Sequence, residues 1–393
     1  MEVAKLATRA GRYIQQPTGY RAFVPAPLPP EPPVRVAGEI QDCLSRADRA
    51  LGRLDGSIQT LPHPDLFVAM YVRKEAVLSS QIEGTQSSLQ DLLAAEARIF
   101  SAERPDDVGE VINYVRAMHH GLARLAELPV SVRLIREIHA ELMAGARGQH
   151  LKPGELRKTQ NWIGPGGCTL REARFVPPPP HEVSRSLGEL EGFLHEPSSL
   201  PLLIRIGLAH AQFETIHPFL DGNGRVGRLL ITFLLCEKEV LAKPVLYLSH
   251  YFKRHRQRYY ECLQAVREDG DWEQWLLFFL RGVHEVSQQA AETARRILQL
   301  RETHRRQITE HFGRTAGNGQ RVLEYLYEHP IVSVSEVRDL VQTTYPAANN
   351  LVRQFERQGI LVEVTGNRRN RRFLYRDYTA LFNDEVDGGR AHG

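Results

Sequence analysis

Apolar residues three and four positions apart recur through most of the chain after residue 36, and this spacing is what most constrains the fold. Residues so spaced lie on one face of an α-helix, so each run predicts a helix that buries that face in a core. The runs occupy residues 40–54, 66–82, 89–100, 111–128, 132–145, 182–195, 202–216, 228–240, 256–268 and 272–308. They predict a mainly α-helical protein, and the last run is long enough to link domains.

Two stretches rich in proline and glycine interrupt the helical pattern. Residues 24–34 hold six prolines, which predicts an extended, polyproline-like arm rather than a helix. Residues 152–180 contain the sequence Gly-Pro-Gly-Gly and end on four prolines. We expect a small β-hairpin, or flap, in this second stretch because turn residues separate two short mixed segments.

The pattern becomes that of a compact module after GRTAGNGQ at 313–320, which predicts a flexible break. Short helices are expected at 320–330, 333–342 and 346–359, and two strands around a Thr-Gly-Asn turn at 360–376. Three helices followed by a basic hairpin resemble a winged helix-turn-helix domain, whose second and third helices form the helix-turn-helix.

Composition narrows the cellular setting. The 393-residue chain is 42% hydrophobic and 25% charged, and its net charge of +3 is too small to predict a polyanionic partner for the whole molecule. Its four cysteines form no CxxC pair, which argues against a disulfide framework and a cysteine zinc site. No window approaches eighteen apolar residues, and the N-terminus lacks an apolar signal core, so we expect a cytoplasmic protein without a membrane partner.

The stretch HPFLDGNGRVGR at 217–228 carries the chemistry. A helix is expected to begin near Gly224, and its exposed backbone N–H groups favour a phosphate. Arg225 and Arg228 are three positions apart and are expected to clamp a di- or triphosphate together. Asp221 is a hard oxygen ligand suited to Mg²⁺ bridged to those phosphates, and His217 has a pKa suited to removing a proton from a hydroxyl. These residues predict a nucleotidyl- or phosphoryl-transfer site.

The same stretch resembles the Fic motif, HPFx[D/E]GN[G/K]RxxR, at every specified position. The resemblance implies a Fic helical bundle that transfers AMP from ATP to Ser, Thr or Tyr hydroxyls of protein targets and of itself. It makes His217 the general base and Asp221 the Mg²⁺ ligand. It implies that the nucleotide phosphates are bound by a cradle formed by Gly222, Asn223, Gly224, Arg225, Val226, Gly227 and Arg228. It further implies that Tyr251 and Tyr259 line the adenine pocket. It also implies that the flap at 152–164 aligns the target by strand pairing.

A second stretch, SSQIEG, resembles the family's inhibitory motif, [S/T]xxxE[G/N], with Ser79, Glu83 and Gly84 in register. The resemblance implies that Glu83 pairs with Arg228 and prevents productive seating of the ATP γ-phosphate. We therefore expect an autoinhibited protein adenylyltransferase. The expected domains are a proline-rich arm with an N-terminal helix (1–60), the Fic domain with its inhibitory helix (61–300) and the winged-helix domain (301–393).

Other interpretations stay open at this point. The chain can be a DNA-binding transcriptional regulator with a nucleotide-sensing Fic-like body, an interpretation supported by Arg353, Arg357, Arg368, Arg369, Arg371 and Arg372. The C-terminal module can instead bind protein or form a homodimer. A Fic enzyme can also remove AMP or transfer another phosphate-containing group. The complete motif favours the enzyme, because a sensor does not need a general base.

Overall fold

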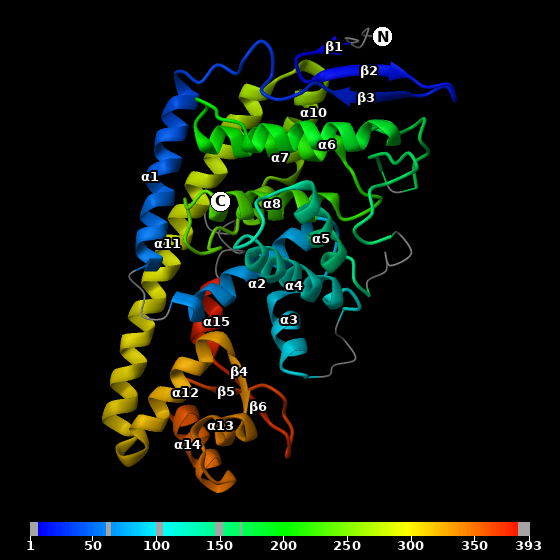
Figure 1. Cartoon of the computed structure of the whole chain (residues 1–393). Coiled ribbons are helices and arrows are strands. Elements are labelled where there is room, and N and C mark those ends of the chain that lie inside the picture. Colours follow the sequence, from blue (N-terminus) through cyan, green and yellow to red (C-terminus); the bar gives the residue numbers. More distant parts are fainter. Residues whose placement is uncertain (1–6, 60–63, 100–104, 146–151, 166, 384–393) are drawn as a thin grey trace, which may run out of the picture.

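The computed structural model describes residues 7–59, 64–99, 105–145, 152–165 and 167–383, and it is mainly helical, as predicted (Figure 1). None of the described helices is long and apolar enough to cross a membrane. The α-helices are α1 (Glu39–Gln59), α2 (Pro64–Ile82), α3 (Leu89–Glu96), α4 (Val108–Arg124), α5 (Val132–Leu142), α6 (Pro180–His195), α7 (Leu202–Ile216), α8 (Asn223–Glu237), α9 (Ser249–Arg254), α10 (Arg256–Asp269), α11 (Trp272–His311), α12 (Ala316–Glu328), α13 (Val334–Val341), α14 (Tyr345–Arg357) and α15 (Arg376–Asn383).

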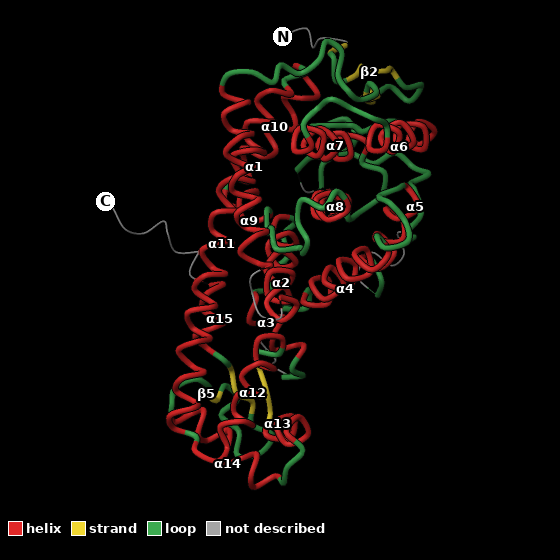
Figure 2. The backbone as a smooth tube through the Cα atoms, turned by 60° about the vertical axis from the view of Figure 1, so that its left-hand side comes forward, coloured by secondary structure: helices red, strands yellow, loops and turns green. Residues whose placement is uncertain are grey.

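Helices α7 and α8 form the centre of the larger body. Nearly every residue of both is buried, because α7 packs against α6, α8, α10 and α11, while α8 also contacts α2, α4 and α5. Apolar residues on all sides of a helix are typical of such a fully enclosed position. Helix α11 runs from this body to α12 at the other end of the molecule, with α1 packed along it (Figures 1 and 2).

A three-stranded antiparallel sheet precedes α1, and the sequence patterns did not predict it. Its strands are β1 (Ala7–Thr8), β2 (Gly11–Gln15) and β3 (Arg21–Pro25), in the order β1-β2-β3. The backbone N–H of Phe23 donates to the carbonyl of Val176 at 2.9 Å, so the sheet is fastened to the end of the flap. The proline-rich segment that follows has no helix or strand before α1, as expected.

The expected flap is a loop with minimal strand pairing. Ile163 and Phe175 form one antiparallel bridge, in which each N–H donates to the other residue's carbonyl at 2.8 and 3.0 Å. The described residues between them form turns. The flap is therefore a very small hairpin, and side chains rather than a strand ladder hold its other parts.

The C-terminal module contains α12, α13, α14 and a sheet of β4 (Ile331–Ser333), β5 (Val362–Glu363) and β6 (Arg372–Leu374), in the order β4-β6-β5. The three helices and the β5–β6 pair were expected, whereas β4 and α15 were not. The segment expected to be a flexible break is a 3₁₀ turn (Gly313–Thr315) followed by the start of α12. Helix α11 is continuous across the expected boundary at 300/301. The winged-helix identification stays a prediction.

This module packs against α2 of the larger body. Helices α12 and α2 are in contact, and the rings of Tyr71 and Phe382 meet edge to face with centroids 5.3 Å apart. Tyr71 lies in the first half of α2, whereas Ser79 lies in its last turn and Glu83 follows its end. One helix thus contacts both the C-terminal module and, through Ser79, the motif helix α8 described below.

Candidate functional site

The motif stretch forms a tight loop between α7 and α8. Helix α7 ends at Ile216, the next residue, His217, has a left-handed backbone (φ 49°), and Gly222 precedes α8 with φ 76°. The side chain of Asn223 bonds both peptide groups of Phe219: it accepts from the N–H and donates to the carbonyl, each at 2.8 Å. Asn223 therefore closes the loop, and its place in the nucleotide cradle stays a prediction.

Side chains of the flap hold this loop from outside. Arg157 donates from Nε to the carbonyl of His217 at 2.9 Å, and Asn161 donates from Nδ2 to the carbonyl of Phe219 at 2.8 Å. On the other side, His139 Nδ1 accepts from the N–H of Gly154, which leaves Nε2 to donate to the carbonyl of Asp221 at 3.1 Å. Sequence reasoning missed these anchors, because each depends on contacts between distant parts of the chain.

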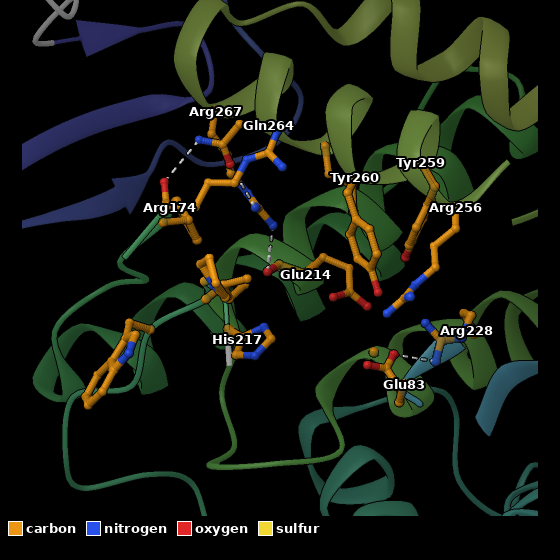
Figure 3. Close-up of a pocket in the computed structure, with 17 residues that line it drawn as sticks. Glu83, Arg174, Glu214, His217, Arg228, Arg256, Tyr259, Tyr260, Gln264 and Arg267 are labelled. Atoms are coloured by element: carbon orange, nitrogen blue, oxygen red, sulfur yellow. Dashed lines mark hydrogen bonds and ion pairs between the residues drawn. The ribbon is translucent and has the colours of Figure 1, made fainter. Parts of the chain in front are cut away.

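A cavity of about 490 Å³ opens above the loop (Figure 3). Five of the residues singled out in the sequence line it, namely Glu83, His217, Gly224, Arg228 and Tyr259. The flap contributes Trp162, Ile163, Arg174 and Phe175, and α10 contributes most of the opposite wall. The structure thus brings the expected base, the start of α8 and the second motif arginine to one space.

Glu83 and Arg228 meet at the edge of this cavity (Figure 3). Arg228 Nη2 donates to Glu83 Oε1 at 2.6 Å and to the carbonyl of Ser79 at 3.0 Å, and Nε donates to Ser79 Oγ at 2.8 Å. A Cβ atom at Gly224 would lie 2.2 Å from Glu83 Oε1, so only glycine leaves room for the carboxylate against the first turn of α8. The contact expected from the sequence resemblance is present. Gly84, in a left-handed conformation (φ 105°), follows directly.

The charges of the cavity follow from burial. Burial lowers the pKa of His217 to about 3, and the positive charges of Arg267 and Arg157 lower it in the same direction. The imidazole is therefore neutral near pH 7, with one of its ring nitrogens unprotonated, as a base requires. Burial also raises the pKa of Glu214 to about 7. Burial alone would lower the pKa of Arg228, but the Glu83 carboxylate holds it above its ordinary value.

Several predicted site residues do not line the cavity. Arg225 pairs with Glu110 of α4 at 3.1 Å and does not line the cavity, so it is not oriented as a joint clamp with Arg228. Tyr251 packs against α11, where a Cβ on Gly282 would lie 2.6 Å from its ring. Tyr251 does not line the cavity with Tyr259, so its assignment to an adenine pocket is wrong for this cavity. Asp221 is half exposed, with one carboxylate oxygen accepting from the N–H of Gly222 at 2.6 Å.

The remaining motif residues support the walls. Val226 is fully buried, and the carbonyl of Gly227 accepts from Nδ1 of His210 at 2.9 Å. Nε2 of His210 then accepts from the hydroxyl of Tyr259 at 2.9 Å. A Cβ on Gly227 would lie 2.3 Å from Glu214 Oε1, so this glycine makes room for a buried carboxyl.

Helix α10 supplies cavity residues that sequence reasoning did not single out. They are Arg256, Tyr260, Leu263, Gln264 and Arg267. Their spacing of three and four positions puts them on one face of the helix, and this stripe of polar and aromatic residues was a readable signal. Glu214, on the last turn of α7, was missed although it lies three residues before His217.

The helical body and its loop-to-helix motif define a protein of the Fic class. Two family descriptions match the chain: "Fic/DOC family N-terminal" over residues 41–123 and "Fic/DOC family" over residues 129–235. Residues 129–235 therefore form a Fic/DOC domain, and residues 41–123 match the region that precedes it in that family.

Curated relatives match about half of the chain. The protein adenylyltransferase Fic of Culex quinquefasciatus is 30% identical over 194 residues, which cover 48% of this chain and 34% of that protein. A probable protein adenylyltransferase of Aquifex aeolicus is 28% identical over 211 residues, covering 51% of this chain and 57% of that protein. The matched region thus spans between about a third and somewhat more than half of these relatives.

Solved structures share the fold. A Fic family protein from Desulfovibrio desulfuricans G20 superposes with a TM-score of 0.57 at 17% identity, over 87% of this chain and 97% of that one. A Fic-1 fragment from C. elegans gives a TM-score of 0.51 at 22% identity, over 65% of this chain and 72% of that one. These likenesses concern the fold alone.

Proposed function

We propose that the protein is an autoinhibited adenylyltransferase that transfers AMP from ATP to hydroxyl side chains of protein targets and of itself. The observation that carries the proposal is the pairing of Glu83 with Arg228 at 2.6 Å beside a cavity lined by His217. The names of the curated relatives agree with it. The proposed domains are the arm with α1 (1–60), the Fic domain (61–300) and the C-terminal domain (301–393).

The neutral imidazole of His217 supplies the base. As the acceptor hydroxyl oxygen bonds to the α-phosphorus of ATP, the bond to pyrophosphate breaks and the hydroxyl proton moves to His217. The N-terminus of α8 at Gly224 presents backbone N–H groups to the phosphates. Burial, and after it the charges of Arg267 and Arg157, keep His217 neutral before transfer, because each disfavours a positive charge on the imidazole.

Glu83 inhibits transfer by holding the γ-phosphate arginine. Its carboxylate lies against Gly224 and uses Nη2 of Arg228, so a γ-phosphate would have to replace the carboxylate. ATP bound beside Glu83 then presents its α-phosphate poorly to the acceptor. Release of Glu83 gives Arg228 back to the nucleotide.

Asp221 fits a role as ligand of an ATP-borne Mg²⁺. Mg²⁺ is commonly held by one or two carboxylates together with substrate phosphates and water, so the single half-exposed carboxylate of Asp221, now 3.8 Å from Arg225 Nη2, is enough. Among the described residues, no group of three metal-ligating side chains forms a cage independent of ATP. When bound, the ion would neutralise the phosphate charge.

The transferred group is tested on the full-length chain with ATP and Mg²⁺, followed by mass spectrometry of the chain itself. Attachment of AMP to a serine, threonine or tyrosine is expected, and a parallel reaction with UTP or CDP-choline tests other groups. Loss of AMP from a pre-modified chain, with no gain in any reaction, would contradict the proposal and favour AMP removal.

Glu83→Gly tests autoinhibition and should raise self-AMPylation about tenfold, which needs only about 1.4 kcal/mol of preference for the reactive geometry. Glu83→Asp should give a partial gain, because the shorter side chain reaches Arg228 poorly. Glu127→Gly is the matched control, since Glu127 is an exposed acid in the turn after α4.

The double variant Glu83→Gly/Arg228→Ala should lose the gain, because the released arginine is no longer present. Circular dichroism confirms that each variant is folded. A drop in self-AMPylation for a folded Glu83→Gly chain would refute autoinhibition by this glutamate.

A further inference from the structure

Glu83 reaches its arginine from a turn that is partly in solvent. Its side chain is 35% exposed, whereas that of Arg228 is 2% exposed. Helix α2 ends at Ile82, and Gly84 follows Glu83 with φ 105°, so the glutamate lies between the end of a helix and a left-handed glycine. Water competes for an exposed carboxylate, and ordering its side chain costs entropy. The strength of the pair therefore depends on how firmly this turn is held.

The side chain of Gln81 fastens the turn on both sides. Its Nε2 donates to the carbonyl of Ser87, in the loop after Glu83, at 2.9 Å. Its Oε1 accepts from Nζ of Lys253, in α9, at 2.7 Å. One amide in the last turn of α2 thus joins the loop beyond Glu83 to a helix of the body. We name this pair of contacts the Gln81–Lys253 latch.

Helix α9 is a firm support for the latch. It is in contact with α2, and its residue Phe252 is fully buried. At the start of α9, the backbone N–H of Ser249 donates to the carboxyl of Glu75 at 3.1 Å, and the hydroxyl of Ser249 donates to the same carboxyl. Glu75 is buried and lies further back on α2. Helix α2 is therefore bonded to α9 twice, once in the interior and once through Gln81.

The outer of these two contacts is the easier one to open. Lys253 is only half-buried, and within the described part of the chain its ammonium group forms no ion pair. Burial lowers the pKa of Lys253, which shows that the ammonium is partly withdrawn from water. A charged donor makes a stronger hydrogen bond than a neutral one, yet this lysine lies near enough to solvent to exchange the bond for water. Opening it leaves the contact of Glu75 with Ser249 intact.

We propose that Gln81 and Lys253 are positioning residues that hold the carboxylate of Glu83 on Arg228. The proposal rests on the autoinhibition proposed above. Neither Gln81 nor Lys253 lines the cavity, so both act through Glu83. When the latch opens, the turn after Ile82 gains freedom while the rest of α2 stays in place. The fraction of chains with an unpaired Arg228 then rises, and transfer rises with that fraction.

Helix α2 offers a matched control at its other end. Lys243 Nζ pairs with Asp65 Oδ1, in the first turn of α2, at 2.5 Å. Like Lys253, Lys243 fastens α2 to another segment of the body through a lysine side chain. Asp65 and Glu83 are separated by about 27 Å of helix at the usual rise per residue. A variant of Lys243 therefore loosens the same helix far from the inhibitory turn.

The test is self-AMPylation of full-length variants with ATP and Mg²⁺, followed by mass spectrometry. Lys253→Met and Gln81→Met keep an unbranched side chain of similar length but remove the latch contacts. Each should raise self-AMPylation about two- to tenfold, the range set by losing one or two hydrogen bonds. Lys253→Arg retains a charged donor and should stay near the wild type, as should Lys243→Met. Residues that only stabilise the fold would lower activity when replaced, and circular dichroism checks folding.

Combined variants identify the route of the effect. In a Glu83→Gly background, Lys253→Met and Gln81→Met should add no further gain, because no carboxylate remains to be released. Gln81→Met/Lys253→Met should equal Gln81→Met alone, because both remove the same contact. These two results would support the latch.

The contrary outcomes are separable. A gain from Glu83→Gly with no gain from either folded latch variant overturns the latch and leaves autoinhibition standing. No gain from Glu83→Gly refutes autoinhibition and the latch with it. An equal gain from Lys243→Met would show that any loosening of α2 suffices. A Lys253→Met gain that persists undiminished without Glu83 would show that Lys253 acts by another route, and both of these results overturn the proposal.

Discussion

Three buried arginines beside the cavity, Arg157, Arg228 and Arg267, have surroundings opposite to those of Arg353 and Arg368 in the C-terminal module. Arg228 is 2% exposed and paired with a carboxylate, and Arg157 and Arg267 are buried and bonded mainly to carbonyl, hydroxyl and amide oxygens. Arg353 and Arg368 lie in solvent. Arg157 and Arg267 have no carboxylate partner of this kind, and burial lowers the pKa of each to about 10.

This difference separates two ways of binding a polyanion. Inside the body, buried charges held by neighbouring groups favour one small, compact anion and, together with burial, keep His217 neutral. On the module, exposed arginines are hydrated, so salt weakens any interaction that they make with an anion. Substitutions inside should therefore change chemistry and stability, whereas substitutions outside should change only salt-dependent binding.

The largest effect is expected for His217→Ala. Loss of the base should lower self-AMPylation by about 10²- to 10⁴-fold while ATP binding, measured by calorimetry, changes little. His181→Ala is the control, because His181 is an exposed histidine at the start of α6. If ATP binding falls as much as transfer does, His217 binds nucleotide and is not the general base.

The next largest effect is a difference in stability between two variants, Arg157→Ala and Arg353→Ala. The first substitution leaves the carbonyl of His217 without its 2.9 Å donor and frees the flap, which should lower the free energy of unfolding by about 3 kcal/mol. The second should change it by less than about 0.5 kcal/mol. Urea unfolding measures the free energy of unfolding of each variant. Equal losses would show that the buried arginine stabilises the chain no more than the exposed one.

The smallest effect concerns the pH dependence of stability through Glu214. Its folded pKa of about 7 lies above its ordinary value of 4.5, so the folded chain retains a proton that the unfolded chain releases. Stability from this group is present below about pH 4.5 and is lost as pH rises to 7, by on the order of 2 kcal/mol. The charges that face it are Arg228, Glu83 and Arg267.

Urea unfolding at pH 5 and pH 7.5 checks this prediction. Glu214→Gln should remove that part of the pH dependence, whereas Glu302→Gln, an exposed change on α11, should keep it. Burial also raises the pKa of Glu75 to about 7, and the contribution of Glu75 to the pH dependence cancels when each variant is compared with the wild type. Parallel pH profiles for wild type and Glu214→Gln would mean that Glu214 ionises normally.

The sequence predicted the helices well, because each buried face repeats within a few residues. It did not predict the N-terminal sheet, whose short strands are stabilised by contacts with distant parts of the chain. Phe23 donates its backbone N–H to the carbonyl of Val176, and its ring centroid lies 5.9 Å from that of Phe175. Periodicity within five residues carries little information about such partners.

The motif showed the same limit at the level of side chains. Its identity and the Glu83–Arg228 contact were expected from the family resemblance. The separation of Arg225 from Arg228 was not, because their directions are set by Glu110 and Glu83, which lie 115 and 145 residues away along the chain. Tyr251 likewise follows its packing against Gly282.

Helix α2 makes the C-terminal module hard to exchange. Tyr71 is covered by Phe382, while Ser79, about two turns further along the same helix, bonds Arg228. A chain cut after α11 would leave an aromatic patch bare on the very helix that positions Glu83. A C-terminal module from another protein could therefore replace this one only if it also covered Tyr71 of α2, as Phe382 does here.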